Sequence, residues 1–262
     1  TTLLNQLQGL DRPTSGEVKV LGLDPVRDRR RLTPRVGSQL QEATTIPRLT
    51  VRECMDLFAS FYPRTRDPEA LLAELGIASK ARSRVEQLSG GQRQRLFIGL
   101  ALLHDPELLF FDELTSALDP QARLAIWDTL RSLKQQGRTI VLTTHSMEEA
   151  QALCDRIAII DAGRIVTEGT PAELVAAHTT GSVLRLRTDR TVTDETLISA
   201  QGVTGVDREG VEILVNGHGN FVVEVLQVLA ADGVGVTSLR LQEATLEDVF
   251  LTLTGRRLQG GE

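Results

Sequence analysis

Residues 88–92 read LSGGQ, and residues 108–113, which begin twenty positions later, read LLFFDE. The first stretch places a serine and two glycines before a helical pattern, where backbone N–H groups can approach an anion closely. The second stretch is an unbroken apolar run that ends in two carboxylates. Such a run predicts a strand of a parallel sheet whose two faces are both covered. Together the two stretches predict an α/β domain that handles a nucleotide phosphate and its magnesium ion.

The composition bounds the size and class of the protein. A chain of 262 residues with 41% apolar side chains can hold one large domain or two modest ones. The formal net charge of −6 argues against a general nucleic-acid binder, which usually has a basic face. Aromatic residues make up only 3% of the chain, so base-stacking surfaces are not expected. We therefore expect no nucleic-acid partner.

Cysteine usage and apolar runs indicate where the protein works. Cys54 and Cys154 lie far apart and lack metal-ligand spacing, so a reduced, intracellular protein is the simplest interpretation. No apolar run in the sequence approaches the roughly 18–20 residues that span a bilayer. If this protein serves a membrane, another polypeptide is expected to supply the membrane part.

Strand and helix patterns alternate through the first two thirds of the chain. This alternation predicts an α/β domain with a mainly parallel sheet over residues 1–178. Two capping boxes, Thr50 with Glu53 and Ser146 with Glu149, predict two helix starts. The predicted strands are 18–21, 36–41, 108–111, 139–144, 156–161 and 164–167, and the other predicted helices are 1–9, 28–33, 68–75, 92–103, 120–136 and 171–177.

The last part of the chain predicts a second, smaller domain. Residues 178–182 are small and polar, which is typical of a linker. The patterns that follow have the order β-α-β-β-α-β, which fits a small α+β ferredoxin-like sandwich over residues 182–262. A final helix predicted over 245–254 carries an apolar stripe at helical spacing, explained either by packing on its own small sheet or by dimer stabilisation. The stripe consists of Leu246, Val249, Phe250 and Leu253.

A histidine completes the set of motifs in the first domain. His145 directly follows the strand-like residues 139–144. The LSGGQ stretch, the adjacent Asp112 and Glu113, and then His145 resemble the ATPase subunit of an ATP-binding-cassette (ABC) transporter. This resemblance implies the P-loop NTPase fold of an ABC nucleotide-binding domain, with a helical subdomain over roughly residues 42–86 that contacts the membrane partner. The text of the last helix, LEDVFL, resembles the C-terminal appendage of the drug-exporter branch, which includes daunorubicin-resistance proteins.

The beginning of the sequence resembles the stretch that follows the phosphate loop of ABC ATPases. Residues 1–17 read TTLLNQLQGLDRPTSGE, and in that family the loop ends Gly-Lys-Thr-Thr before a helix. By this resemblance the glycine loop and its lysine lie before residue 1, and residues 1–262 alone are expected to have little ATPase activity. Thr1 would then be a hydroxyl ligand of Mg²⁺, and Thr2 would touch the α-phosphate. Taken alone, the dipeptide is better explained as the ordinary start of a helix.

Asp112 and Glu113 are the candidate metal ligand and catalytic base. At the carboxyl end of a strand, Asp112 would hold Mg²⁺, directly or through water. Glu113 would orient or deprotonate the attacking water. An acidic pair in this place is also typical of a solvated loop start, but the other motifs at these spacings favour the functional interpretation. Leu114 departs from the family pattern, in which proline usually follows the pair, and the lost rigidity would loosen the aim of Glu113.

The LSGGQ stretch supplies the candidate nucleotide-binding residues, which are Ser89, Gly90, Gly91 and Gln92. A Ser-Gly-Gly triplet is by itself typical of a helix N-cap with a flexible turn. The resemblance implies that this loop grips the γ-phosphate of an ATP held on the opposite subunit. Two copies would then form a homodimer with two shared sites. Asp119, in the loop across the seam of that dimer, would pair near the opposite phosphate loop.

Gln41 and His145 complete the candidate catalytic set. Gln41 ends the predicted strand 36–41, and Gln39 is an equal rival on position alone. The family pattern favours Gln41 as the glutamine that senses Mg²⁺ and the attacking water. A lone histidine is usually structural or simply exposed, but the resemblance makes His145 the switch residue that contacts the γ-phosphate and holds Glu113.

The resemblance also implies what the whole protein does. It is expected to bind ATP and Mg²⁺, to hydrolyse ATP as a homodimer, and to drive export through a separate transmembrane permease at the cytoplasmic face of the cell membrane. A kinase or GTPase interpretation fails because no glycine-rich loop with lysine occurs within the 262 residues. Two alternatives stay open, a soluble ABC-type ATPase that acts on ribosomes or DNA and a regulatory ATP-binding module without turnover. The transported substrate is open as well.

Overall fold

The computed structural model describes residues 2–39, 48–179 and 181–255. They form two compact units, Thr1–Glu149 and Ala150–Glu262. This break lies earlier in the chain than the predicted domain boundary at residues 178–182. The predicted boundary separates a two-stranded sheet from a four-stranded one, and it stays a prediction.

A parallel three-stranded sheet is the centre of the first unit, as the alternation of elements predicts. Its strands are β1 (Val36–Gln39), β2 (Leu108–Asp112) and β3 (Thr139–Thr143), in the order β1-β2-β3. Every residue of β2 is buried, which is why its sequence is apolar without alternation. Because the strands run parallel, the residues that follow β2 and β3 emerge at the same edge of the sheet.

Helices and loops cover both faces of this sheet. On one face, Leu108 and Phe110 share a buried cluster with Leu4 of α1 (Thr2–Leu7). On the other face, α5 (Gly90–Leu102) approaches β1 so closely that a Cβ added to Gly37 would lie 2.2 Å from the carbonyl oxygen of Ala101. Glycine is therefore required at this strand position, because any side chain would push the helix off the sheet.

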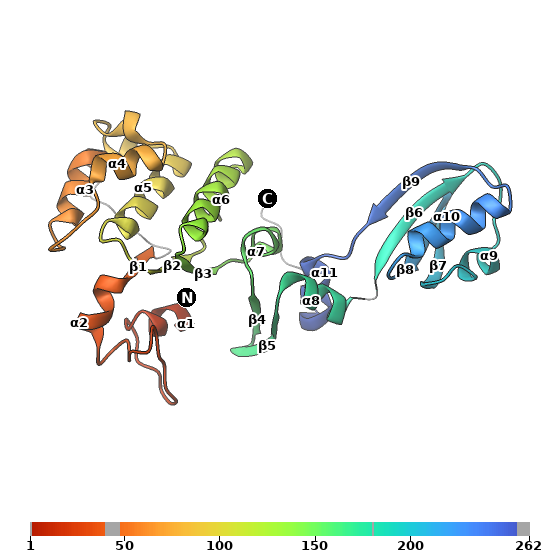
Figure 1. The fold of residues 1–262 in the computed structure, drawn as a ribbon, viewed down its shortest axis with the longest axis horizontal. Helices are drawn as coiled ribbons and strands as arrows, with labels where there is room; N and C mark the ends of the chain where they lie inside the picture. Colours follow the sequence, from red (N-terminus) through yellow and green to blue (C-terminus); the bar gives the residue numbers. More distant parts are fainter. Residues whose placement is uncertain (1, 40–47, 180, 256–262) are drawn as a thin grey trace. The chain divides into compact units, whose positions relative to one another are not determined.

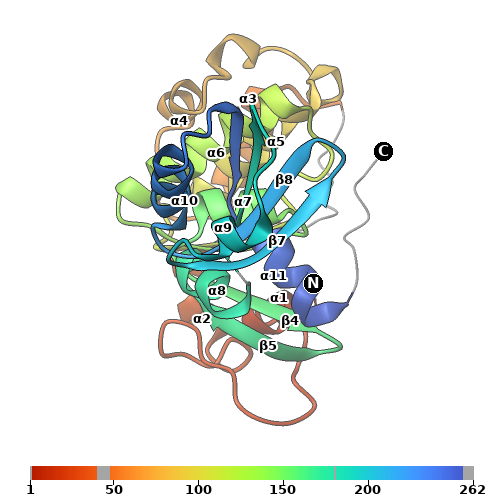
Figure 2. The same cartoon turned by 90° about the vertical axis from the view of Figure 1, so that its right-hand side faces the viewer.

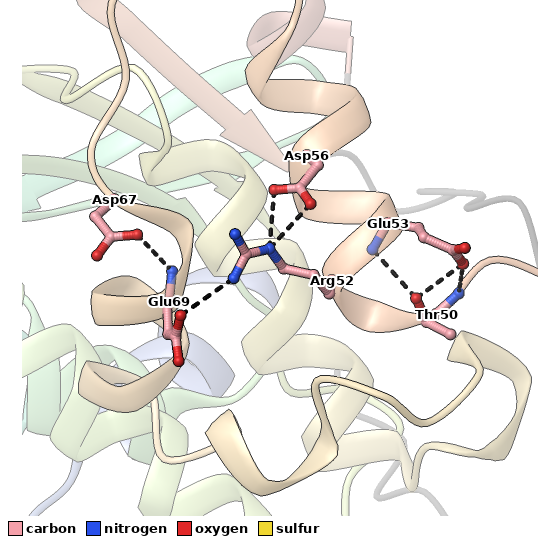
Figure 3. A network of polar contacts seen from close by, with 6 residues as sticks. All are labelled: Thr50, Arg52, Glu53, Asp56, Asp67 and Glu69. Atoms are coloured by element: carbon pink, nitrogen blue, oxygen red, sulfur yellow. Dashed lines mark hydrogen bonds and ion pairs between the residues drawn. The ribbon is translucent and has the colours of Figure 1, made fainter.

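The remaining helices of the first unit begin largely where capping residues predict. They are α2 (Arg29–Leu32), α3 (Val51–Ala59), α4 (Pro68–Glu74), α6 (Pro120–Gln135) and α7 (Met147–Leu153), with short 3₁₀ turns at Thr33–Arg35, Ala78–Lys80 and Val85–Gln87. The helix start predicted at Thr50 is confirmed: the Thr50 N–H donates to Glu53 Oε2 at 2.8 Å, and the Glu53 N–H donates back to Thr50 Oγ1 at 3.2 Å (Figure 3). These hydrogen bonds lower the pKa of Glu53 below its ordinary value. Arg52, which lies between Thr50 and Glu53 in the sequence, joins α3 to α4 through Asp56 and Glu69 (Figure 3).

One predicted strand of the first unit is wrong. Residues 18–21 form only an isolated bridge, in which Val20 and Leu23 exchange backbone hydrogen bonds of 2.8 and 2.9 Å. Between them Leu21 and Gly22 have φ values of 51° and 77°, so the chain reverses direction there. The apolar side chains of this segment pack on the sheet through the cluster of Leu108 and Phe110. The pattern was apolar because the segment is buried, and burial alone does not specify a strand.

The second unit contains two sheets. The hairpin predicted around Ala162 and Gly163 is confirmed, with both residues at positive φ between β4 (Ile157–Asp161) and β5 (Arg164–Gly169). Helix α8 (Pro171–His178) follows. The later elements are β6 (Ser182–Thr188), α9 (Asp194–Ile198), β7 (Val203–Glu209), β8 (Glu212–Gly217), α10 (Phe221–Ala231), β9 (Val236–Gln242) and α11 (Leu246–Thr254).

The later elements follow the predicted β-α-β-β-α-β order up to β9. Their strands form one antiparallel sheet in the order β7-β8-β6-β9. Helices α9 and α10 lie on one face of it, where Leu197, Phe221 and Val225 share a buried core with Leu184 and Leu186 of β6 (Figures 1 and 2).

The final helix α11 packs against α8, at the other end of the unit's sequence (Figure 1). Leu246 and Val249 of its apolar stripe are buried. This arrangement differs from packing on the small sheet, because the partner of α11 within the chain is α8. Dimer stabilisation by the rest of the stripe stays a prediction. The sequence of a helix shows which face is apolar, but it does not show which surface will cover that face.

We expect His104 to make the first unit less stable in mild acid. Its Nε2–H donates to the Val36 carbonyl oxygen at 2.9 Å, its ring stacks on Tyr62 with centroids 4.2 Å apart, and its Nδ1 is buried without a partner among the described residues. Burial lowers the pKa of His104 below its ordinary value of 6.5. The unfolded chain therefore takes up this proton first, so stability is kept above about pH 6.5 and lost as the pH falls toward the lower folded pKa.

The measurement is the free energy of unfolding of the intact protein between pH 7.5 and 5.5, compared with that of His104→Gln. The wild-type value should fall more steeply with acid, by up to about 1.4 kcal/mol per pH unit, which is the limit for one proton. Parallel curves for the two proteins would show that this histidine does not contribute.

Candidate functional site

The carboxyl ends of β2 and β3 bring the predicted metal ligand next to the neighbouring strand. Asp112 is the last residue of β2, is only 3% exposed, and pairs in register with Thr143 of β3. The Thr143 hydroxyl donates a hydrogen bond to Asp112 Oδ1. This bond holds the carboxylate at the sheet edge, in the position from which strand ends present ligands in open α/β sheets.

Glu113 and His145, which lie 32 positions apart in the sequence, come together at this edge. Glu113 Oε2 lies 3.8 Å from His145 Nδ1 and accepts a 3.3 Å hydrogen bond from Ser116 Oγ. The Glu113 side chain is 32% exposed and that of His145 59% exposed, so both can meet a ligand from solution. The predicted pairing of the carboxylate with the histidine therefore agrees with their positions in the structure.

The backbone of Glu113 is held in an unusual conformation. Its φ is +48°, in the left-handed region that non-glycine residues seldom adopt, and its N–H donates to the Thr143 carbonyl oxygen at 3.0 Å. Ser116 Oγ donates to the Glu113 carbonyl oxygen at 3.0 Å. Left-handed residues of this kind persist where the surroundings fix them and cluster at functional sites. These contacts turn the chain sharply after Asp112 and set the direction of the Glu113 side chain.

Leu114 stands where proline was expected, and the structure compensates for the missing ring. Its side chain is buried, with 3% exposure, and its carbonyl oxygen accepts a hydrogen bond from the Gln94 side-chain amide of α5. The main chain directly after Glu113 is thus anchored to α5. The expected loosening of Glu113 is opposed by this contact.

The signature stretch forms the start of α5. Ser89 is the N-cap: its Oγ accepts from the Gln92 N–H at 3.3 Å, and Gln92 Oε1 accepts from the Ser89 N–H at 3.1 Å. A Cβ added to Gly91 would lie 2.8 Å from Ala122 Cβ on α6, and one added to Gly90 would lie 3.3 Å from Leu118. The glycines therefore allow α5 to begin close against α6 and the loop before it. The first turn of a helix of this length presents N–H groups that have no intrahelical partner, which suits an anion.

Asp119 and Thr2 occupy helix starts, and two candidates fall outside the description. Asp119 is the N-cap of α6, where its Oδ1 accepts from the Ala122 N–H at 2.9 Å. Thr2 is exposed and begins α1. Thr1 and Gln41 lie outside the described residues, so their predicted roles stay predictions.

Gln39, the positional rival of Gln41, is described by the structure. It ends β1, is 5% exposed and pairs in register with Phe111. Its Oε1 is buried without a hydrogen-bond partner among the described residues.

A buried carboxylate near the site was missed as a functional candidate. The sequence predicts that Glu149 closes a capping box with Ser146, and half of that box exists: Ser146 Oγ accepts from the Glu149 N–H at 3.2 Å. The Glu149 carboxylate instead accepts from Thr115 Oγ1 at 2.7 Å and from Trp127 Nε1 at 3.0 Å. The signal in the sequence was the single tryptophan, because a buried indole N–H needs an acceptor.

The oxygen atoms at this edge suit a Mg²⁺ ion that the protein would hold together with a bound nucleotide. No group of three or more His, Cys, Asp or Glu side chains in the described part of the chain could hold a metal by itself. Mg²⁺ is usually bound through one or two carboxylates together with phosphates of the substrate and water. Asp112, buried and oriented by Thr143, supplies one such carboxylate.

Known proteins resemble this chain over nearly all of its length. The sequence pattern of the family described as "ABC transporter" matches residues 1–116. The daunorubicin resistance ATP-binding protein DrrA3 of Streptomyces coeruleorubidus is 37% identical over 265 residues, which cover 97% of this chain and 83% of that protein. The Nod factor export ATP-binding protein I of Rhizobium etli is 36% identical over 269 residues, which cover 99% of this chain and 82% of that protein.

A solved structure shows the same fold. The structure described as that of an ATP binding subunit of an ABC transporter matches with a TM-score of 0.59 at 25% identity. The match covers 67% of this chain and 75% of that one. Within the described ranges, no helix has the length and apolar character needed to cross a membrane.

Proposed function

This chain belongs to the ABC transporter family as one of its ATP-binding subunits, and from that membership we propose how its residues carry out the reaction. It is an ATPase that powers export through a separate membrane subunit, and its similarity to ATP-binding proteins of daunorubicin resistance and Nod factor export supports this function. The observation that carries the proposal for the site is the 3.8 Å approach of Glu113 Oε2 to His145 Nδ1 at the carboxyl edge of the parallel sheet.

Asp112, Glu113 and His145 divide the catalytic work in this proposal. Asp112 would hold Mg²⁺, with Thr1 and Gln41 as further ligands, and the ion would supply positive charge that offsets the developing charge on the phosphates. Glu113 orients the attacking water and accepts its proton. His145 donates toward the γ-phosphate and keeps the Glu113 carboxylate in place. Gln41 senses the metal and the water. The left-handed backbone at Glu113 and the 3.8 Å approach of its carboxylate to His145 support this division.

The signature residues act on the nucleotide of a second copy in this proposal. Ser89, Gly90, Gly91 and Gln92 begin α5, a 13-residue helix whose first N–H groups face a γ-phosphate bound mainly by the partner copy. Thr2 touches the α-phosphate of the nucleotide held by its own copy. Asp119 pairs across the seam near the partner's phosphate loop. Two copies related by a two-fold axis would enclose two ATP molecules.

The second unit and the location of the protein complete the proposal. The antiparallel order β7-β8-β6-β9, with α9 and α10 on one face, supports a ferredoxin-like accessory domain over residues 182–262. The protein works at the cytoplasmic face of the cell membrane, held there by its transmembrane partner. The word export in the name of the Nod factor relative supports this location.

His145→Ala in the intact protein tests the catalytic assignment. We expect Mg²⁺-dependent ATP hydrolysis to fall about 10- to 100-fold, because a donor to the transferred phosphoryl group and the neighbour of Glu113 are both lost. His178→Ala is the matched control, since that histidine contacts Thr167 on β5 and lies outside the site. The assay is steady-state phosphate release. Equal rates for His145→Ala and wild type would remove His145 from the mechanism.

A further inference from the structure

A buried carboxylate links the two segments that carry the catalytic pair. Glu149 is 2% exposed, and its Oε1 accepts hydrogen bonds from both Thr115 Oγ1, at 2.7 Å, and Trp127 Nε1, at 3.0 Å. The three residues come from three separate segments: the loop after β2, helix α6 and helix α7. One oxygen atom thus fixes three segments in a single arrangement.

The positions of these residues in the chain relate the link to the chemistry. Thr115 lies two residues after Glu113, and Glu149 lies four residues after His145. Between Glu149 and His145, the Ser146 side chain caps α7 by accepting from the Glu149 N–H, and the Ser146 N–H donates to Thr144 Oγ1 at 2.9 Å. The backbone that carries His145 is therefore tied at both sides. Glu149 ties it in turn to the loop that carries Glu113.

We infer that Glu149 is a positioning residue, which holds the Glu113 loop and the His145 segment at the separation that hydrolysis needs. The inference rests on the proposed function, because it assigns roles to Glu113 and His145. Glu149 itself is buried, and the proposed mechanism assigns it no contact with substrate. Glu149 would act on the separation of the two catalytic side chains. Reaction rates depend strongly on such separations, and a displacement of about 1 Å can lower the rate about 100-fold.

The chemistry of the link explains why an acid occupies this position. A carboxylate offers only acceptors, and here one oxygen receives both a hydroxyl and an indole N–H. Hydrogen bonds to a charged acceptor are stronger than those between neutral groups, more so in a buried place. The Glu149 backbone N–H takes no part in this link, because it donates to Ser146 Oγ. An apolar residue at position 149 would leave the Thr115 hydroxyl and the Trp127 N–H buried without this acceptor, and the two segments would no longer be joined.

Thr115→Val is the sharpest test, because valine has nearly the shape of threonine and removes only the donor. In the intact protein we expect kcat for ATP hydrolysis to fall about 10- to 100-fold with KM for ATP little changed, since the link does not contact the nucleotide. Thr115→Ser, which restores the hydroxyl, should recover most of the rate. Glu149→Ala should lower kcat at least as much. Combined with Thr115→Val, it should add little, because both changes break the same link.

Glu148→Gln is the matched control for Glu149. Glu148 is the preceding residue on α7, has a 74% exposed side chain and forms an ion pair with Arg123 at 3.6 Å. Its kcat should equal that of the wild type. Thermal unfolding of each variant shows whether it is folded at the assay temperature, and Thr115→Val provides the answer if Glu149→Ala does not fold.

The outcomes separate this inference from the proposed function. If the wild-type protein hydrolyses ATP and a folded Thr115→Val variant matches it in kcat, the positioning role is wrong and the ATPase assignment stands. A drop in melting temperature with an unchanged kcat would likewise reduce Glu149 to a purely structural contact. If the wild-type protein itself does not hydrolyse ATP together with Mg²⁺, the proposed function fails first.

Discussion

Replacing Glu113 by glutamine is expected to reduce steady-state ATP hydrolysis by about 10²- to 10⁴-fold, the usual contribution of a general base. Glutamine keeps the size of the side chain and can still accept the 3.3 Å hydrogen bond from Ser116. It cannot take a proton from water. The left-handed backbone at residue 113 is unchanged by the substitution, so the amide should occupy the place of the carboxylate. ATP binding should persist, because Glu113 is not assigned to the phosphates. Phosphate release and ATP binding by the intact protein are the two measurements.

Glu107→Gln is the matched control for this variant. Glu107 directly precedes β2, whereas Glu113 directly follows it, so the two acids lie at opposite ends of one strand. Glu107 is paired with Arg35 at 2.5 Å, and this contact lowers its pKa below the ordinary value. We expect its replacement to leave hydrolysis unchanged. If Glu113→Gln hydrolyses ATP as fast as the wild type, the base lies elsewhere and the proposed mechanism is wrong.

ATP is expected to convert the Glu113→Gln protein from monomer to dimer. With hydrolysis blocked, each nucleotide stays between the phosphate-binding residues of one copy and the signature of the other. Sedimentation velocity with saturating ATP and Mg²⁺ measures the effect, and the same protein without nucleotide gives the baseline. If the protein stays monomeric with ATP bound, the two-copy site is excluded.

Ser89→Asp in the Glu113→Gln background tests whether the signature forms part of the seam. Aspartate is as good an N-cap as serine, so α5 should keep its start. The new charge, however, would face the γ-phosphate, and like charges placed together at an interface cost several kcal/mol, which weakens association by more than about 100-fold. Thr50→Asp is the control, because Thr50 is the N-cap of a complete capping box on α3 (Figure 3). A dimer that survives Ser89→Asp would place Ser89 outside the interface.

Local sequence signals predicted most element starts in this protein. The capping box at Thr50 begins α3 and the one at Ser89 begins α5. Both could be predicted because a capping box is formed by four consecutive residues. The apolar run at 108–111 forms a fully buried strand, as expected when four consecutive side chains are all apolar. The order β-α-β-β-α-β of the elements from β6 to β9 could also be predicted, because each change in hydrophobic periodicity marks a new element.

Long-range contacts account for the predictions that the structure corrected. The segment 18–21 is apolar because it covers the sheet, and its turn at Leu21 and Gly22 depends on that packing. The stripe on α11 found its partner in α8, which lies about 70 residues earlier in the chain. The Glu149 carboxylate accepts from Thr115 and Trp127 and not from the N-cap residue Ser146, because buried donors from other segments outcompete a solvated local donor.

The sequence by itself identified the candidate site residues: an acidic pair at a strand end, a histidine after the next strand, and a serine with two glycines at a helix start. Each of these signals lies within a few consecutive residues, where backbone geometry alone brings the groups together. Only the tertiary structure decided that Glu113 lies 3.8 Å from His145 and that Glu149 accepts hydrogen bonds from Thr115 and Trp127. Such distances depend on the packing of segments far apart in the chain, and no short stretch of sequence contains that information.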